Sequence, residues 1–177
     1  EAFRLFPDGS VEVVSLHDEC KEVMIYLGGG EPTLSATAVG RGRVEFRRAE
    51  LAAVATPEEF AKDEYRYLII PDVSLQKARI VANALQGVAD VWSNNSFGFA
   101  RELPEGVLGR VERVERIEIF DIKSLKRELK GKGVDIILRD FPMGVDEIRK
   151  RTASRSGNEK RIALTRIAGK SYTIYLA

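Results

Sequence analysis

The stretch that decides the fold is residues 113–177, RVERIEIFDIKSLKRELKGKGVDIILRDFPMGVDEIRKRTASRSGNEKRIALTRIAGKSYTIYLA. Its first eight residues alternate charged and apolar side chains, which predicts a half-buried strand. Asp121 or Ser124 can cap a helix that continues to Lys130, where Gly131-Lys132-Gly133 ends it. The stretch therefore opens with a strand followed by a short helix.

The remainder of this stretch predicts four further elements. They are a strand over 134–139, a helix over 147–151 capped by Asp146, and a terminal hairpin of 161–167 with 171–176. The order strand, helix, strand, helix, strand, strand predicts an α/β (α+β) fold, built as a small mixed-sheet sandwich. Because the last strand is apolar and stands at a chain end, we expect a free sheet edge over 171–176.

The first 50 residues predict a separate small unit. Its elements are a Val-rich strand over 11–16, a helix over 17–27 capped by Ser15 or Asp18 and stopped by Gly28-Gly29-Gly30, and a hairpin of 34–39 with 43–47 around Gly40-Arg41-Gly42. These elements are too few to close a dinucleotide-binding type of sheet unaided.

Between these units, residues 49–63 are Ala-rich and contain Thr56-Pro57-Glu58-Glu59, which is typical of a helix start. We place a domain boundary in this stretch. The elements that follow are a strand over 65–70, an amphipathic helix over 73–85, and two short strands within 90–100 around Asn94-Asn95. We therefore expect domains over 1–50, 51–106 and 107–177.

The net charge of +1 hides an asymmetry along the chain. Residues 1–106 hold 11 Lys and Arg against 17 Asp and Glu, whereas residues 107–177 hold 17 against 10. A basic half of this kind favours a polyanionic partner. The alternative explanation is an ordinary solvated surface whose charge drifts along the sequence.

The basic half contains two groups of cations. One surrounds the polar loop TASRSGNE, and the other is a strip formed by Lys123, Lys126, Arg127, Lys130 and Lys132. Lys and Arg on a flexible polar loop suit contacts with a phosphate backbone. The candidate phosphate-binding residues are Arg149, Lys150, Arg151, Arg155, Lys160, Arg161, Lys126 and Lys130. A solvated helix face beside a hairpin loop would give the same pattern.

Catalytic and metal-binding patterns are missing from the sequence. His17 and Cys20 could share one helical face, but two ligands are too few for a metal site. No glycine-rich turn follows a predicted strand and opens a helix, so we expect no cofactor-binding site and no catalytic residue in this chain. A single cysteine fits a reducing cytoplasm, and the apolar runs are strand-sized, so we expect no membrane span.

Several motifs resemble a family of bacterial S-adenosylmethionine-dependent methyltransferases that end in a THUMP-like domain. The motifs are DIKSLKRELK, VDEIRKR and IALTRIAGK in the last third, and YLIIPDVSLQKARIVANAL, which looks like the family's Y-L-x-x-P-D segment at the start of a ferredoxin-like part. The stretch VEVVSLHDECKEVMIYLGG is similar to the end of the family's Rossmann-like methyltransferase domain, with Glu19, Lys21 and Glu22 at matching positions.

The resemblance implies three modules in the order found here: the end of a methyltransferase domain, a ferredoxin-like segment and a basic THUMP-like domain. It implies a structured RNA, tRNA or rRNA, as partner, and S-adenosylmethionine as the cofactor of the parent protein. The chain begins with Glu1 rather than Met, which favours a fragment of a longer protein. The resemblance implies that it is the C-terminal part, with the catalytic domain upstream of Glu1. The competing hypothesis is a protein-interaction or dimerisation module with no nucleic-acid role.

Overall fold

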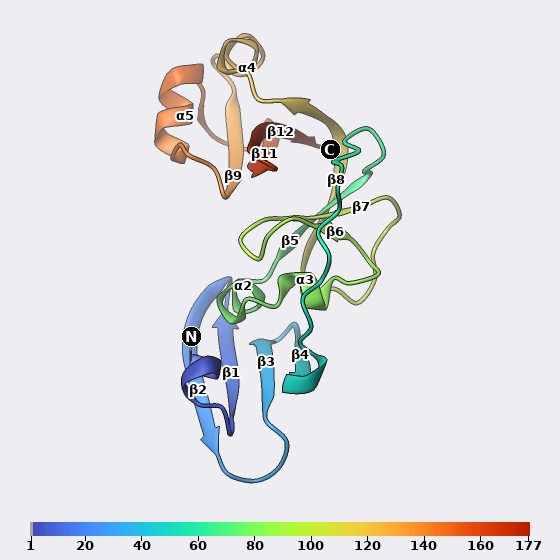
Figure 1. The fold of residues 1–177 in the computed structure, drawn as a ribbon. Helices are drawn as coiled ribbons and strands as arrows, with labels where there is room; N and C mark the ends of the chain where they lie inside the picture. The colour runs from blue at the N-terminus through green and yellow to red at the C-terminus, as the bar shows by residue number, and fades with distance from the viewer. Residues whose placement is uncertain (1) are drawn as a thin grey trace.

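The computed structural model describes residues 2–177, which form a mixed α/β fold with two sheets (Figure 1). The N-terminal sheet has four strands in the order β2-β1-β3-β4, in which β1 and β3 are parallel and the outer pairs are antiparallel. Its elements are α1 (Ala2–Leu5), β1 (Gly9–Leu16), β2 (Glu19–Leu27), β3 (Thr33–Ala38), β4 (Gly42–Arg47) and the 3-10 helix η1 (Arg48–Glu50). The hairpin predicted in this region, β3–β4, is confirmed.

The helix predicted over 17–27 is wrong, because this stretch is the strand β2. His17 and Asp18 have φ angles of 53° and 61°, and Leu16 pairs with Glu19 across them. Two successive residues at positive φ are typical of the two-residue turn that fits the twist of a hairpin. The apolar second half of β2, VMIYL, has high β propensity. Pairing with β1 therefore overrides the helix-like composition of HDECKE.

The second sheet has eight strands in the order β10-β9-β11-β12-β8-β5-β7-β6. Figure 1 shows it extending from the middle of the molecule to the C-terminal half. Its elements are β5 (Tyr67–Pro71), α2 (Val73–Ala78), α3 (Val81–Ala84), β6 (Asp90–Val91), β7 (Gly98–Ala100), β8 (Gly109–Ile119), α4 (Ile122–Leu129), β9 (Gly133–Arg139), α5 (Val145–Thr152), β10 (Arg155–Ser156), β11 (Lys160–Ile167) and β12 (Lys170–Leu176). Every strand and helix predicted for the last third is present, and β10 is an addition to the prediction. The cap predicted at Asp146 is wrong, because α5 begins at Val145 after Gly144 and Asp146 lies in its first turn.

The single helix predicted over 73–85 is broken into α2 and α3. Arg79 ends α2 in the left-handed conformation, with φ of 61°. Ile80 is buried after the break, as are Leu75 and Leu85 on either side of it. In a continuous helix Ile80 would lie about 140° around the axis from Leu75. The break is what allows both side chains to reach the core.

Residues 51–66 form an irregular connection where a helix was predicted over 49–63. The ring of Phe60 anchors this connection, with its centroid 5.3 Å from that of Tyr65 and 4.8 Å from that of Tyr172. Trp92 and Phe99 complete the aromatic cluster. Aromatic packing favours this route, because the Ala-rich stretch has few large side chains that a helix could bury.

The free edge predicted over 171–176 is also wrong, because β12 lies between β11 and β8. Its side chains are buried almost continuously, as expected of a central strand. β8 pairs with β5 through its first residues and with β12 through its last ones. One long strand thus joins the middle of the chain to the C-terminal part, and the division into domains at 50 and 106 stays a prediction.

Asp72 joins the two sheets at the start of α2. Its carboxylate accepts a hydrogen bond from the hydroxyl of Ser15 on β1 at 2.6 Å and caps α2 by accepting from the amide of Ser74 at 2.9 Å. The side chain is 1% exposed. Burial raises the pKa of Asp72, but the hydrogen bonds from Ser15 and Ser74 together lower it by more, so the pKa lies below its ordinary value. The carboxylate is therefore held charged at this junction.

Candidate nucleic-acid interface

The exposed face of α4, together with Lys130 directly after its last residue, carries a row of four cations. Lys123, Lys126, Arg127 and Lys130 follow each other at positions i, i+3, i+4 and i+7, which places them on one side of a helix. All four are exposed, while Leu125 and Leu129 on the opposite side are fully buried. Seven residues of helix cover about 10 Å. We call these four residues the α4 stripe.

The α4 stripe is free of internal ion pairs. Within residues 2–177, none of its four side chains lies within ion-pair distance of a carboxylate. Together with Asp121 they line an open hollow of about 600 Å³. Asp121 itself is engaged as the helix cap, because its carboxylate accepts hydrogen bonds from two amides of the first turn. Unpaired, solvated cations around an open hollow can receive the phosphates of a polyanion.

An ion pair on the side of α4 that faces the sheet fixes the orientation of this helix. The guanidinium of Arg116 on β8 donates to both carboxylate oxygens of Glu128, at 2.7 and 2.8 Å, and stacks on the ring of Tyr175 at 3.5 Å. Burial raises the pKa of Glu128, but the hydrogen bonds from Arg116 and Tyr175 together lower it by more, so the pKa lies below its ordinary value. The charged pair therefore ties α4 to the sheet on the side away from the stripe.

The cations of α5 and the following loop are engaged differently. Arg151 pairs with Glu147 at 2.8 Å, and Arg155 pairs with Glu159. Arg161 donates to both carboxylate oxygens of Glu112 at 2.8 and 2.9 Å. Each of these three arginines therefore already has a carboxylate partner within the chain.

Two lysines in this region remain without an ion pair among the described residues. Lys150 is exposed on α5, whereas Lys160 is partly buried at the start of β11. Arg149 lies 3.8 Å from the fully exposed Asp146, so its pairing is loose. Of the eight candidate phosphate-binding residues, the structure thus leaves Lys126, Lys130 and Lys150 the most available.

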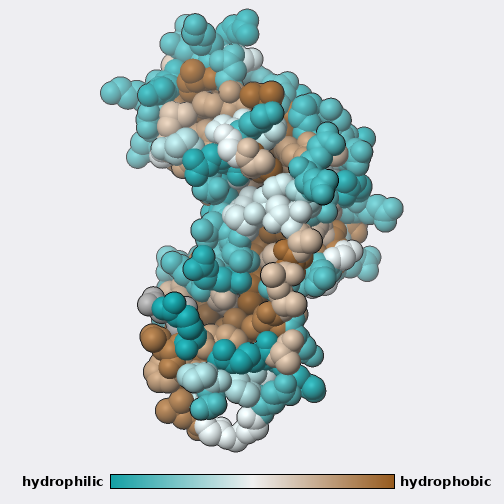
Figure 2. Space-filling view, in the orientation of Figure 1, coloured by the Kyte–Doolittle hydropathy of each residue, from teal (hydrophilic) through white to brown (hydrophobic). Residues whose placement is uncertain are grey.

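The two cation groups lie together at one end of the molecule. The amide of Gly131 after α4 donates to the carbonyl of Ala153 after α5 at 2.8 Å, and the amide of Arg155 donates to the carbonyl of Lys132 at 2.9 Å. These bonds tie the C-terminal ends of both helices together. Figure 2 shows hydrophilic residues around α4 and α5 at the top of the view. Cations also stabilise a helix C-terminus, which explains part of this clustering without any ligand.

Lys123 and Arg127 were assigned to the basic strip but not to the eight candidate phosphate-binding residues. Lys123 and Arg127 belong to the same face as Lys126 and Lys130, and the spacing in KSLKRELK is the signal that identifies that face. The pairing of Arg161 with Glu112 had no such signal, because the two residues are 49 positions apart.

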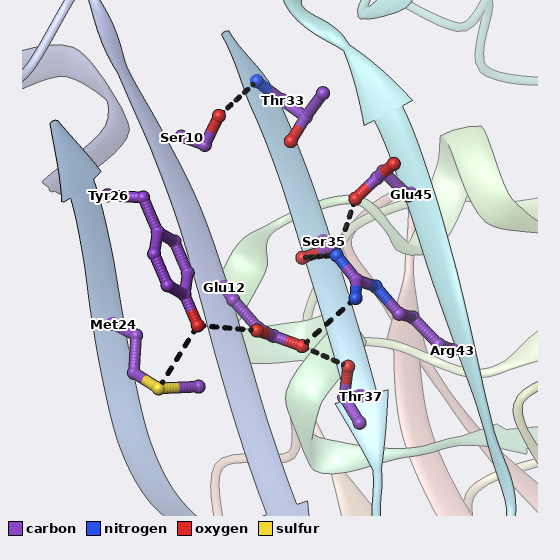
Figure 3. A network of polar contacts seen from close by, with 9 residues as sticks. All are labelled: Ser10, Glu12, Met24, Tyr26, Thr33, Ser35, Thr37, Arg43 and Glu45. Carbon is purple, nitrogen blue, oxygen red and sulfur yellow. Dashed lines mark hydrogen bonds and ion pairs between the residues drawn. The ribbon is translucent and has the colours of Figure 1, made fainter. Parts of the chain in front are cut away.

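A second polar network lies on the open face of the N-terminal sheet (Figure 3). Thr37 donates to one carboxylate oxygen of Glu12 at 2.6 Å, and Tyr26 donates to the other at 3.2 Å. Arg43 approaches the same carboxylate at 3.8 Å and also donates to Ser35. Glu12 is held by these partners, so this network stabilises the sheet and presents no free acid or base.

Other sites considered in the sequence do not assemble in the described residues. His17 and Cys20 lie on a turn and a strand, so the helical face that could have shared a metal does not exist. Between residues 2 and 177, no three His, Cys, Asp or Glu residues gather as metal ligands. Gly28-Gly29-Gly30 was predicted to end a helix, but it links the strands β2 and β3. None of the helices described is both long and apolar enough to cross a membrane.

Comparison with known proteins places the α4 stripe within a recognised domain. Residues 109–177 match a family described as THUMP domain-like. This range runs from the start of β8 through β12, and we call it the THUMP-like domain. It contains all eight candidate residues.

The whole fold is shared with a larger protein. The crystal structure of a "putative methyltransferase" from Porphyromonas gingivalis W83 superposes with a TM-score of 0.78 at 20% sequence identity. The match covers 96% of this chain and 45% of that one, so this chain spans less than half of its length. No match was found among curated proteins.

Proposed function

We propose that this chain is the non-catalytic, RNA-binding part of an S-adenosylmethionine-dependent methyltransferase. Its THUMP-like domain holds a structured RNA, such as tRNA or rRNA, by the phosphate backbone. A separate domain of the same longer protein, preceding residue 1, supplies the cofactor site and the chemistry in the cytoplasm. Support comes from the THUMP-like match, since THUMP domains generally bind RNA, and from the fold shared with the Porphyromonas gingivalis protein.

The observation that carries the proposal is the unpaired α4 stripe. Exposed cations without an ion pair also occur singly in the described residues, at Lys77 and Lys170 for example. The α4 stripe differs because four of them surround one open hollow, whereas the neighbouring Arg151 is paired with Glu147. Phosphate contacts position an RNA without reading its bases. Lys150 and Arg149 on the adjacent α5 extend the same surface.

The test is the affinity of the chain for a fluorescent RNA hairpin, measured by anisotropy at low salt. We expect the variant K123Q/K126Q/R127Q/K130Q to bind at least tenfold more weakly than the wild type. A matched control, K77Q/R79Q/R113Q/K170Q, removes the same charge at exposed positions outside α4. We expect it to bind within about threefold of the wild type, because loss of long-range attraction alone is a smaller effect.

Two outcomes would contradict the proposal. One is a wild-type chain with no measurable affinity for RNA at low salt. The other is an equal loss of affinity in both variants, which would mean that net charge and not the α4 stripe determines binding. Calorimetric titration with S-adenosylmethionine tests the non-catalytic part: we expect no heat of binding to this chain, and saturable binding would refute that part.

A further inference from the structure

The strand β2 forms a free edge of the N-terminal sheet. It is nine residues long and pairs only with β1, in one continuous antiparallel register broken by a single bulge. The backbone groups on its other side therefore have no strand partner among the described residues. A long open edge of this kind is a template for pairing with another strand.

The other three sheet edges of the described chain are protected. β10 and β6, at the two ends of the eight-stranded sheet, have two residues each. β4, at the opposite edge of the N-terminal sheet, alternates the charged residues Arg43, Glu45 and Arg47 with its inward side chains. Short length and charge are the usual means by which proteins block edge pairing. β2 has neither protection over its second half.

Apolar side chains gather on this unprotected edge. Val23 is 51% exposed and Leu27 72%, and Ile25 is exposed as well, all three on the face of β2 that continues from Val11 and Val13 of β1. Tyr26 lies on the opposite face, where it donates to Glu12. Figure 2 shows this hydrophobic surface along the flank of the lower part of the molecule, over β2. An exposed, contiguous apolar patch is typical of an interaction surface.

The patch borders an apolar groove beside the start of the chain. Ala2 and Phe3 line one side of this groove, Val23 lines another, and Val11 and Val13 form part of its floor. Its volume is about 240 Å³. Val11 and Val13 belong to the sheet face that packs on α2, so the groove is where that core continues past the covering helix towards β2.

We propose that β2 pairs with an edge strand of the methyltransferase domain, so that the N-terminal sheet continues the sheet of that domain. The inference rests on the proposed function, and it names the surface through which the RNA-binding part is joined to the catalytic one. The Porphyromonas gingivalis protein, which shares this fold over 45% of its chain, has more than enough additional length for such a domain. Ala2, the first residue that the structure describes, lines the groove.

A second copy of this chain fits the edge less well. In a symmetric antiparallel pairing of the whole strand, Glu19 would face Leu27, and Lys21 would face Ile25. Each charged residue of the first half would then lie opposite an apolar residue of the second. Cross-strand pairs are stabilising when the side chains are alike in polarity or opposite in charge. A better partner is a strand that places polar residues opposite the first half of β2 and apolar residues opposite the second half.

Hydrogen–deuterium exchange on this 177-residue chain and on the longer protein tests the proposal. We expect the β2 amides that do not pair with β1 to exchange roughly 100-fold more slowly in the longer protein. The outward amides of β4 are the internal control and should exchange rapidly in both. Ile25→Lys should leave the melting temperature of this chain within about 2 °C and lower that of the longer protein by several degrees.

Three results would overturn the proposal. The first is equally fast exchange of the β2 amides in both proteins. The second is protection of β2 in this chain that rises with concentration alongside a dimer in sedimentation, which would identify a second copy as the partner. The third is a gene that encodes no domain ahead of residue 1. RNA affinity measured on the same samples separates a failure of the proposed function from a failure of this interface.

Discussion

Arg116 and Glu128 form an ion pair between the strand β8 and the inner side of α4, in which the Nη2 of Arg116 lies 2.7 and 2.8 Å from the two carboxylate oxygens. The same guanidinium lies on the ring of Tyr175, so its position is fixed from two directions. Because α4 has only eight residues, its orientation depends on such contacts more than on its own helix propensity. The pair therefore determines where the α4 stripe points.

Breaking this pair should loosen α4. We expect Arg116→Ala and Glu128→Gln each to lower the free energy of unfolding by about 1 kcal/mol, the range of a partly exposed ion pair. Urea unfolding of both single variants and the double variant measures the coupling between them. Purely additive losses would show that the two side chains do not stabilise the fold through each other.

The same pair predicts a dependence of stability on pH. The folded-state pKa of Glu128 is lower than the ordinary value of 4.5. Its contribution is therefore complete above pH 4.5 and is lost as the pH falls through the folded-state value. Wild type should exceed Glu128→Gln in unfolding free energy at pH 7, and the difference should shrink as the pH falls below 4.5 through the folded-state value. A difference that did not decrease on acidification below pH 4.5 would show that the carboxylate charge is not what stabilises α4.

Asp72 should matter more than its surface neighbours, because it caps α2 and accepts the hydroxyl of Ser15 from the other sheet. We expect Asp72→Ala to lower the free energy of unfolding by about 2 kcal/mol, combining the loss of a cap with that of a buried hydrogen bond. Asp146→Ala is the control, since Asp146 is fully exposed in the first turn of α5. Equal losses in thermal or urea unfolding would contradict the role given to Asp72.

The last third of the fold could be predicted because its signals are local and agree with one another. The alternation in RVERIEIF, the cap at Asp121 and the turn at Ala168-Gly169 each define an element without help from distant residues. The structure added the short strand β10, moved the start of α5 to Val145 and changed the position of the last strand. Whether β12 lies at an edge or in the centre depends on its pairing with β8, which no local pattern encodes.

The first half was less predictable because distant contacts decide its elements. β2 begins with a helix-like composition and becomes a strand through pairing with β1. Arg79 interrupts a helical pattern because Ile80 must reach the same core as Leu75. At the candidate site, the sequence indicated which cations are present. Only the structure showed which are already paired, since Glu112 and Arg161 are far apart along the chain.

Gly109 marks a close backbone contact at the start of β8. A Cβ atom there would lie 2.4 Å from the carbonyl oxygen of Ile70 on β5. We therefore expect Gly109→Ala to lower the free energy of unfolding by roughly 2 kcal/mol or more. Gly106→Ala is the control, because nothing lies within 4 Å of a Cβ atom at Gly106 and only its positive φ opposes the change. A loss no larger than that of the control, in urea unfolding, would show that β5 and β8 can separate at little cost.

The salt dependence of RNA binding tests the central claim most directly. Each phosphate contact adds a little under one unit to the slope of log affinity against log salt concentration. The account predicts that the variant K123Q/K126Q/R127Q/K130Q has a slope smaller than that of the wild type by roughly three units. The matched control K77Q/R79Q/R113Q/K170Q should keep the wild-type slope to within about one unit. Equal slopes for the wild type and the α4 variant would contradict the claim that this face of α4 holds the RNA backbone.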